Sequence, residues 1–82
     1  MSGTGARRLL VPRPARVVAD TDGRPLSIDG RAVQCVVETW LLEDRWWTER
    51  PLRRRYWEVL ERSGADRVVF HDLVGGGWWR QR

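Results

Sequence analysis

Lysine is absent from this chain, and cysteine and histidine occur once each, as Cys35 and His71. A lone cysteine excludes an internal disulfide, and one cysteine with one histidine cannot supply the ligands of a usual structural zinc site. No stretch approaches the roughly 18 consecutive apolar residues of a membrane-spanning helix. The apolar run near the start, Leu9–Val11, is too short for the core of a signal peptide. We therefore expect a cytoplasmic protein with no cofactor and no membrane contact.

Aromatic residues and arginine are abundant instead. The 82 residues include six tryptophans, one tyrosine and one phenylalanine, and all 15 basic residues are arginine against 11 acids. A domain of this size buries only about 60% of its unfolded surface, so a few large rings could anchor its core. The guanidinium group forks onto carboxylate or phosphate and stacks on rings. A net charge of +4 is compatible with a polyanionic partner without requiring one.

Two Asp-Gly pairs mark tight turns in the first half of the chain, because this dipeptide supplies the positive φ of hairpin turns. They are Asp22-Gly23 and Asp29-Gly30. We read residues 1–14 as a mobile arm carrying Arg7, Arg8 and Arg13, and residues 15–82 as one domain. The strands expected around the two turns are Arg16–Asp20, Arg24–Ile28 and Arg31–Leu42.

The third of these strands alternates apolar and polar residues. Val33, Cys35 and Val37 fall on one face, which favours a half-buried strand. In that setting Cys35 is expected to be a small buried hydrophobic residue.

The segment Glu49–Arg62 fits two structures. As a helix it places Leu52, Tyr56, Val59 and Leu60 on one face and stops at Ser63-Gly64. As a strand, Arg53–Glu61 pairs with Asp66–Val74, with Trp57 and Val59 opposite Val68 and Phe70. Periodicity alone does not decide between them. Gly75–Gly77 is read as a turn and Trp78–Arg82 as a last strand.

Adjacent tryptophans carry a separate expectation. On a strand, Trp46 and Trp47 must point to opposite faces, as must Trp78 and Trp79. If the domain has one core, one member of each pair lies outside it. Trp47 and Trp79 are therefore the candidates for exposed rings, and the candidates for the core are Trp40, Trp46, Trp57 and Trp78.

Arginines gather beside these rings. Arg53-Arg54-Arg55 precede Tyr56-Trp57, and charge next to aromatics is typical of surfaces that bind single-stranded nucleic acid. The alternative is a solvated strand or internal pairing with nearby acids such as Glu43 and Glu58. The candidate binding residues are Arg45, Trp47, Arg53, Arg54, Arg55, Trp79 and Arg80. No motif supports catalysis: His71-Asp72 lacks a placed nucleophile, and Gly75–Gly77 lacks the Lys-Ser/Thr of a phosphate loop.

The order of these motifs resembles a small uncharacterised domain of actinobacteria, similar to the C-terminal domain of ImuB-like proteins. Those proteins are Y-family DNA polymerase homologues of the damage-induced mutasome. The residues that carry the resemblance are Gly23-Arg24-Pro25, Trp40, Trp46-Trp47, Arg55–Val59 and Gly77-Trp78. The chain departs from the family pattern at Arg82, where an aromatic-Asp ending is missing, and in Ser27–Gly30, which lacks an aromatic.

This resemblance implies an all-β fold and favours the strand for Arg53–Glu61. We expect a small antiparallel curled sheet or partly open barrel of about five or six short strands. It also implies a non-enzymatic accessory in bacterial DNA repair or translesion synthesis. The partner would be a polymerase-complex protein, meaning a Y-family homologue or an error-prone polymerase, or single-stranded DNA. The alternative is a structural or homo-oligomerising protein whose exposed tryptophans pack at a self-interface.

Overall fold

The computed structural model describes residues 11–45 and 47–82, and these form an all-β fold with one antiparallel sheet. Trp46 and residues 1–10, including Arg7 and Arg8, lie outside the described residues. The strands are β1 (Arg13–Pro14), β2 (Val17–Ala19), β3 (Pro25–Ile28), β4 (Arg31–Asp44), β5 (Leu52–Glu61), β6 (Asp66–Asp72) and β7 (Trp78–Arg80). Their order across the sheet is β1-β7-β6-β5-β4-β3-β2. The curled antiparallel sheet expected from the sequence is confirmed, and its described residues form seven strands where about five or six were expected.

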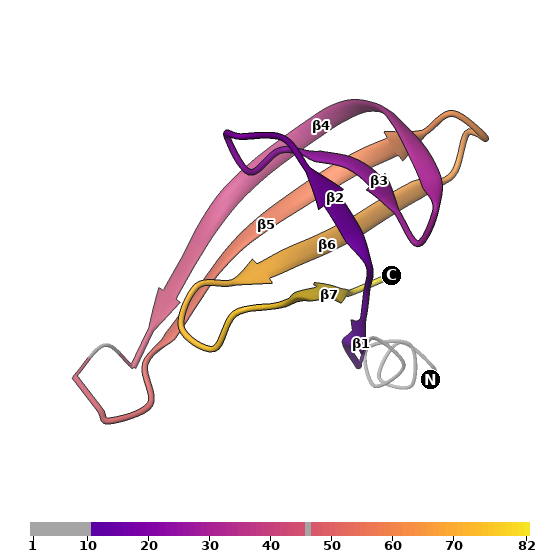
Figure 1. Ribbon diagram of the computed structural model, residues 1–82. Helices are drawn as coiled ribbons and strands as arrows, with labels where there is room; N and C mark the ends of the chain where they lie inside the picture. Colours follow the sequence, from indigo (N-terminus) through magenta and orange to yellow (C-terminus); the bar gives the residue numbers. More distant parts are fainter. Residues whose placement is uncertain (1–10, 46) are drawn as a thin grey trace, which may run out of the picture.

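The chain itself links the two edges of this sheet. β1 pairs with β7 and β2 pairs with β3, yet only Ala15 and Arg16 separate β1 from β2. The amide of Ala15 donates to the carbonyl of Trp78, and the amide of Asp29 donates to the carbonyl of Arg16. The sheet therefore curls into a half-barrel, with β2 and β3 lying over β5 and β6 (Figure 1). Arg13 and Pro14, expected in the arm, belong to the sheet.

Both Asp-Gly turns form as the sequence predicts. Asp29 and Gly30 have φ of 51° and 82°, the two positive values that a type I′ hairpin turn requires. At the earlier turn, the Asp20 carboxylate accepts the amides of Asp22 and Arg24 at 2.8 and 3.0 Å. These local bonds fix the β2–β3–β4 meander, in which β2 and β3 form the lid of the half-barrel.

Two apolar clusters lie on opposite faces of the sheet. Inside the half-barrel, buried Ile28, Val59 and Val69 pack with half-buried Val17, Val33, Val36, Trp57 and Trp78. On the outer face, Tyr56, Val68 and Phe70 pack with Trp79. The expectation of a single core is therefore wrong, and consecutive aromatic residues can both be shielded.

β5 is a strand of ten residues, so the helical alternative for Glu49–Arg62 is wrong. Its register also differs from the pairing expected. Trp57 lies opposite Val69, and Tyr56 lies opposite Phe70. The β5–β6 pairing is therefore shifted by one residue from the prediction, and Val68 and Phe70 lie on the outer face with Tyr56.

Cys35 is exposed, which corrects the expectation that it would be buried. The β4–β5 register shifts between Val33 and Cys35 and again between Val36 and Glu38. Each shift is a bulge that breaks the two-residue alternation of a strand. As a result Val33 and Val36 face the core, and Cys35 turns outward.

Candidate functional site

The predicted binding residues do not form one patch. The structure places Arg45 and Trp47 at the connection between β4 and β5, Arg54 and Trp79 on the outer face, and the remaining arginines on the inner face. Side chains alternate between the two faces along β5, which explains this split. The side chains of Arg53 and Arg55 lie on the same face as Trp57, and the side chain of Arg54 lies on the same face as Tyr56.

The β4–β5 connection exposes the largest apolar side chain at this end. Trp47 is 65% exposed, as the sequence predicts for one member of its pair. Arg45 is exposed and has φ of 54°, a left-handed value that is uncommon outside glycine, Asn and Asp. Its amide is held by the Asp44 carboxylate at 2.7 Å, and its carbonyl accepts the Thr48 amide at 3.0 Å. These bonds hold Arg45 and Thr48 in place at the start of the connection.

A row of aromatic rings crosses four strands on the outer face. Trp40 on β4 stacks on Tyr56 on β5 with centroids 5.3 Å apart, Tyr56 lies 5.0 Å from Phe70 on β6, and Phe70 lies 6.5 Å from Trp79 on β7. Each pair occupies directly opposite positions in the register. Trp79 is half-buried here, which corrects the expectation of an exposed ring, and Trp40, expected in the core, is 38% exposed.

Arg54 is part of this row. Its guanidinium carbon lies 4.3 Å from the centroid of Phe70, and Nη1 donates to the Tyr56 hydroxyl at 3.2 Å. Stacking of this kind is worth roughly 0.5–2 kcal/mol. Arg54, Phe70 and Trp79, with Pro12 and Asp72, line a hollow of about 260 Å³. Arg54 therefore stabilises the aromatic row and offers little to a phosphate group.

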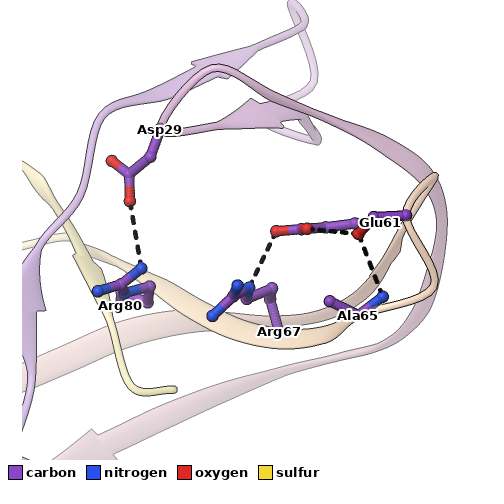
Figure 2. A network of polar contacts seen from close by, with 6 residues as sticks. Asp29, Glu61, Ala65, Arg67 and Arg80 are labelled. Atoms are coloured by element: carbon purple, nitrogen blue, oxygen red, sulfur yellow. Dashed lines mark hydrogen bonds and ion pairs between the residues drawn. The ribbon is translucent and has the colours of Figure 1, made fainter.

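Carboxylates of the same chain hold two more of the predicted arginines. Arg53 pairs with Glu43 at 3.0 Å, and Arg80 pairs with Asp29 at 3.6 Å. The second pair links β7 to the β3–β4 turn across the mouth of the half-barrel (Figure 2). Arg55 is half-buried between Leu41 and His71 in the register and has no ion pair among residues 11–45 and 47–82.

Beside the Arg80–Asp29 pair, Glu61 is the one buried charged residue among those the structure describes, with 1% exposure. Its carboxylate accepts from Arg67 Nε at 2.9 Å and from the Ser63 hydroxyl at 3.0 Å. Figure 2 shows the Glu61–Arg67 contact at the β5–β6 end. Both networks tie strands together, which is a structural role.

Two carboxyl groups have shifted pKa values. The amides of Gly75 and, less strongly, Val74 donate to Asp72 and lower its pKa. The pKa of Glu58 is raised, chiefly by a hydrogen bond with the Asp66 carboxyl group. Arg82 lies 3.4 Å from Glu58 and 3.5 Å from Asp66, so one guanidinium faces both carboxylates.

β4 exposes more large apolar side chains than its sequence pattern predicts. On β4, Val37 is 58% exposed, and Trp40, Leu41 and Leu42 are each 38% exposed. The difference in length between neighbouring strands is the signal that could have predicted this exposure. β4 has 14 residues and β3 only four, so most of β4 must extend past its neighbour.

These surfaces can stack aromatic rings and can pair with a further strand. His71, for example, stacks on Trp78 with centroids 4.7 Å apart and planes 8° from parallel.

The described part of the chain contains no group of three or more side chains suited to hold a metal ion, and no helix long and apolar enough to cross a membrane.

Comparison of the chain with known protein families, with curated proteins and with solved structures gives no match. The candidate surfaces therefore have to be interpreted from their own geometry.

Proposed function

We propose that this chain is a non-enzymatic, cytoplasmic binding module that docks on a protein of a polymerase complex, as an accessory in bacterial DNA repair or translesion synthesis. The setting rests on the resemblance to the C-terminal domain of ImuB-like proteins. The observation that carries the docking mode is the exposed apolar surface of Val37, Trp40, Leu41, Leu42 and Trp47. These residues lie along one strand and the connection that follows it. Exposed apolar side chains grouped in this way are typical of protein interaction sites, and tryptophan is enriched in their most important contacts.

The arginines support protein over nucleic acid. Arg53 and Arg80 are engaged with carboxylates, and Arg54 with aromatic rings. A phosphate track would have to displace these partners. Single-stranded DNA remains the second candidate, because Arg45 and Arg55 have no ion pair among the described residues and the chain carries a net charge of +4.

The salt dependence of binding distinguishes a protein partner from single-stranded DNA. The chain is titrated with a purified Y-family polymerase homologue and, separately, with a fluorescein-labelled 30-mer of thymidine, at 50 and 200 mM salt. We expect binding to the protein to change less than about threefold. DNA binding through phosphate contacts would fall steeply, by about tenfold or more. Trp47→Ala should weaken protein binding about tenfold, whereas Val18→Ala, an exposed apolar site on β2, is the matched control.

The result that overturns the proposal is tight, strongly salt-dependent binding of the oligonucleotide with no binding of the polymerase homologue. Absence of oligonucleotide binding even at low salt would instead remove the second candidate.

A further inference from the structure

One side of β4 has no neighbouring strand over most of its length. β3 pairs only with Arg31 and Ala32 at its start. From Val33 to Asp44, the register among the described residues is with β5 alone. Figure 1 shows this strand running along the rim of the sheet past the end of β3.

The hydrogen bonds of β5 identify the backbone groups that point to this open side. The Leu73 amide donates to the Arg53 carbonyl at 2.9 Å, so the backbone of Arg53 faces away from β4. Because backbone direction alternates along a strand, Arg54 faces β4 and bonds with its opposite residue, Leu42. The residues of β4 whose amides and carbonyls point outward are therefore Thr39, Leu41 and Glu43.

This edge carries little of the protection that edges usually have. From Glu38 to Asp44 the register with β5 is regular, because both bulges lie earlier in β4. The stretch contains no proline and no basic residue, and it exposes Trp40, Leu41 and Leu42. Natural sheets blunt free edges with proline, charged residues, bulges or short strands. Here the charged residues, Glu38, Glu43 and Asp44, lie at the two ends of the stretch, so its centre is a template for a further strand.

The charges near this edge indicate which kind of residue an added strand would need there. Glu38 lies directly opposite Glu58, an unfavourable like-charge pair. Glu58 is also hydrogen-bonded to Asp66, and Arg82 contacts Glu58 and Asp66. Glu38 has no ion pair among the described residues. The far end of the edge adds Glu43, which is paired with Arg53, and Asp44. A lysine or arginine on an added strand would relieve the repulsion at Glu38.

We propose that the open edge, Thr39–Glu43, binds an extended segment of a partner protein as an eighth strand. The segment has an apolar centre and a basic residue placed beside Glu38. This inference rests on the proposed function, since it names how the protein partner docks. A second copy of the chain fits less well, because antiparallel self-pairing about Leu41 would set Glu38 against Asp44 of the other copy on both sides of the axis.

A designed peptide tests the edge directly. The probe is a fluorescein-labelled heptapeptide that alternates valine and threonine between two terminal lysines, with a matched peptide that ends in glutamates. We expect the lysine peptide to bind at least about tenfold more tightly. Glu38→Arg should remove or reverse this preference, while Glu49→Arg, an exposed acid in the β4–β5 connection, should leave it.

Leu41→Pro tests the backbone pairing. Proline removes the backbone amide of residue 41, which forms no hydrogen bond with β5, so the fold should be retained. Without this amide, the peptide loses one hydrogen bond and should bind about tenfold more weakly. Leu41→Thr keeps the amide and should stay within about threefold of the unmodified chain. If Leu41→Pro fails to fold, the peptide is N-methylated instead at alternate positions. One of the two methylated sets should abolish binding, and the other should not.

Three results would overturn the inference: neither peptide binds, both methylated sets bind equally, or the chain forms a dimer that Leu41→Pro dissolves. The proposed function is judged separately. If Leu41→Pro binds the polymerase homologue as the unmodified chain does, the edge is not the docking site, but the proposed function stands. If the unmodified chain does not bind the homologue, the proposed function fails, and the peptide result alone decides whether the edge accepts a strand.

Discussion

The two ends of β4 differ in their surroundings, because only Val33 and Val36, near its start, are half-buried against the core. Near its start, the lid of β2 and β3 covers the sheet, and Ile28 from β3 is 1% exposed against Val59 and Val69, both 0% exposed. Beyond Glu38, the strand lies outside the lid and exposes Trp40, Leu41 and Leu42. We refer to these regions as the covered end and the open end. The same strand thus contributes to stability at one end and presents a surface for binding at the other.

The largest contrast is expected from apolar truncations. Ile28→Ala at the covered end should lower the free energy of unfolding by about 3–4 kcal/mol, because it removes buried methyl groups and leaves a cavity. Leu42→Ala at the open end should cost about 1 kcal/mol or less, since the side chain is already 38% exposed. Urea unfolding followed by tryptophan fluorescence measures both. Equal losses would show that the open end is as well packed as the covered end.

Two arginine–glutamate pairs give a second contrast. Glu61 is buried with Arg67, whereas the Glu43 side chain in the pair with Arg53 is 52% exposed. Glu61→Ala leaves a partly buried guanidinium without its carboxylate and should cost about 3 kcal/mol. Glu43→Ala should cost less than about 1 kcal/mol. Thermal unfolding at low and high salt is the measurement, and only the Glu43 pair should weaken noticeably with salt. A Glu61→Ala loss below about 1 kcal/mol would contradict this assignment.

The smallest effect is expected from Asp72, in the β6–β7 connection. Amides lower its pKa below the ordinary value of 3.8, so the folded chain binds this proton less readily than the unfolded chain. Its contribution to stability is therefore present above about pH 4 and lost as pH falls toward the folded pKa. Asp72→Asn should cost about 1 kcal/mol at pH 7 and less near pH 2. Unfolding curves at the two pH values, compared with those for Asp22→Asn in an exposed turn, provide the check; an equal cost at both would contradict it.

Much of the fold was predictable because its turns are local. Asp22-Gly23, Asp29-Gly30 and the Gly75–Gly77 turn lie where the sequence predicts them. The face of each residue was harder to predict. The bulges before Cys35 and Glu38 change which side chains of β4 point to the core, and only tertiary packing determines where such bulges form. In β5 and β6 both faces carry apolar residues, so the hydrophobic pattern could not determine the register between these two strands.

The candidate site was less predictable than the fold. The sequence identified Trp47, and it named Glu43 as a partner for the Arg53–Arg55 run, which the Arg53–Glu43 pair confirms. It gave no partner for Arg80. Arg80 meets Asp29 only after the sheet curls, and Arg54 meets Phe70 only through the β5–β6 register. The open edge follows from the unequal lengths of β3 and β4. The strands expected from the sequence, Arg24–Ile28 and Arg31–Leu42, already differ in length, but their lengths alone do not show which side of the longer strand stays unpaired.

The pairing of β1 with β7 has a kinetic consequence. Arg13 lies opposite Arg80, so this contact joins residues near the start of the chain to the last strand. The β2–β3 and β5–β6 hairpins join residues that are close in sequence, whereas this pairing joins residues that are far apart. Contacts between distant residues slow folding. The half-barrel is therefore expected to close after the local hairpins have formed.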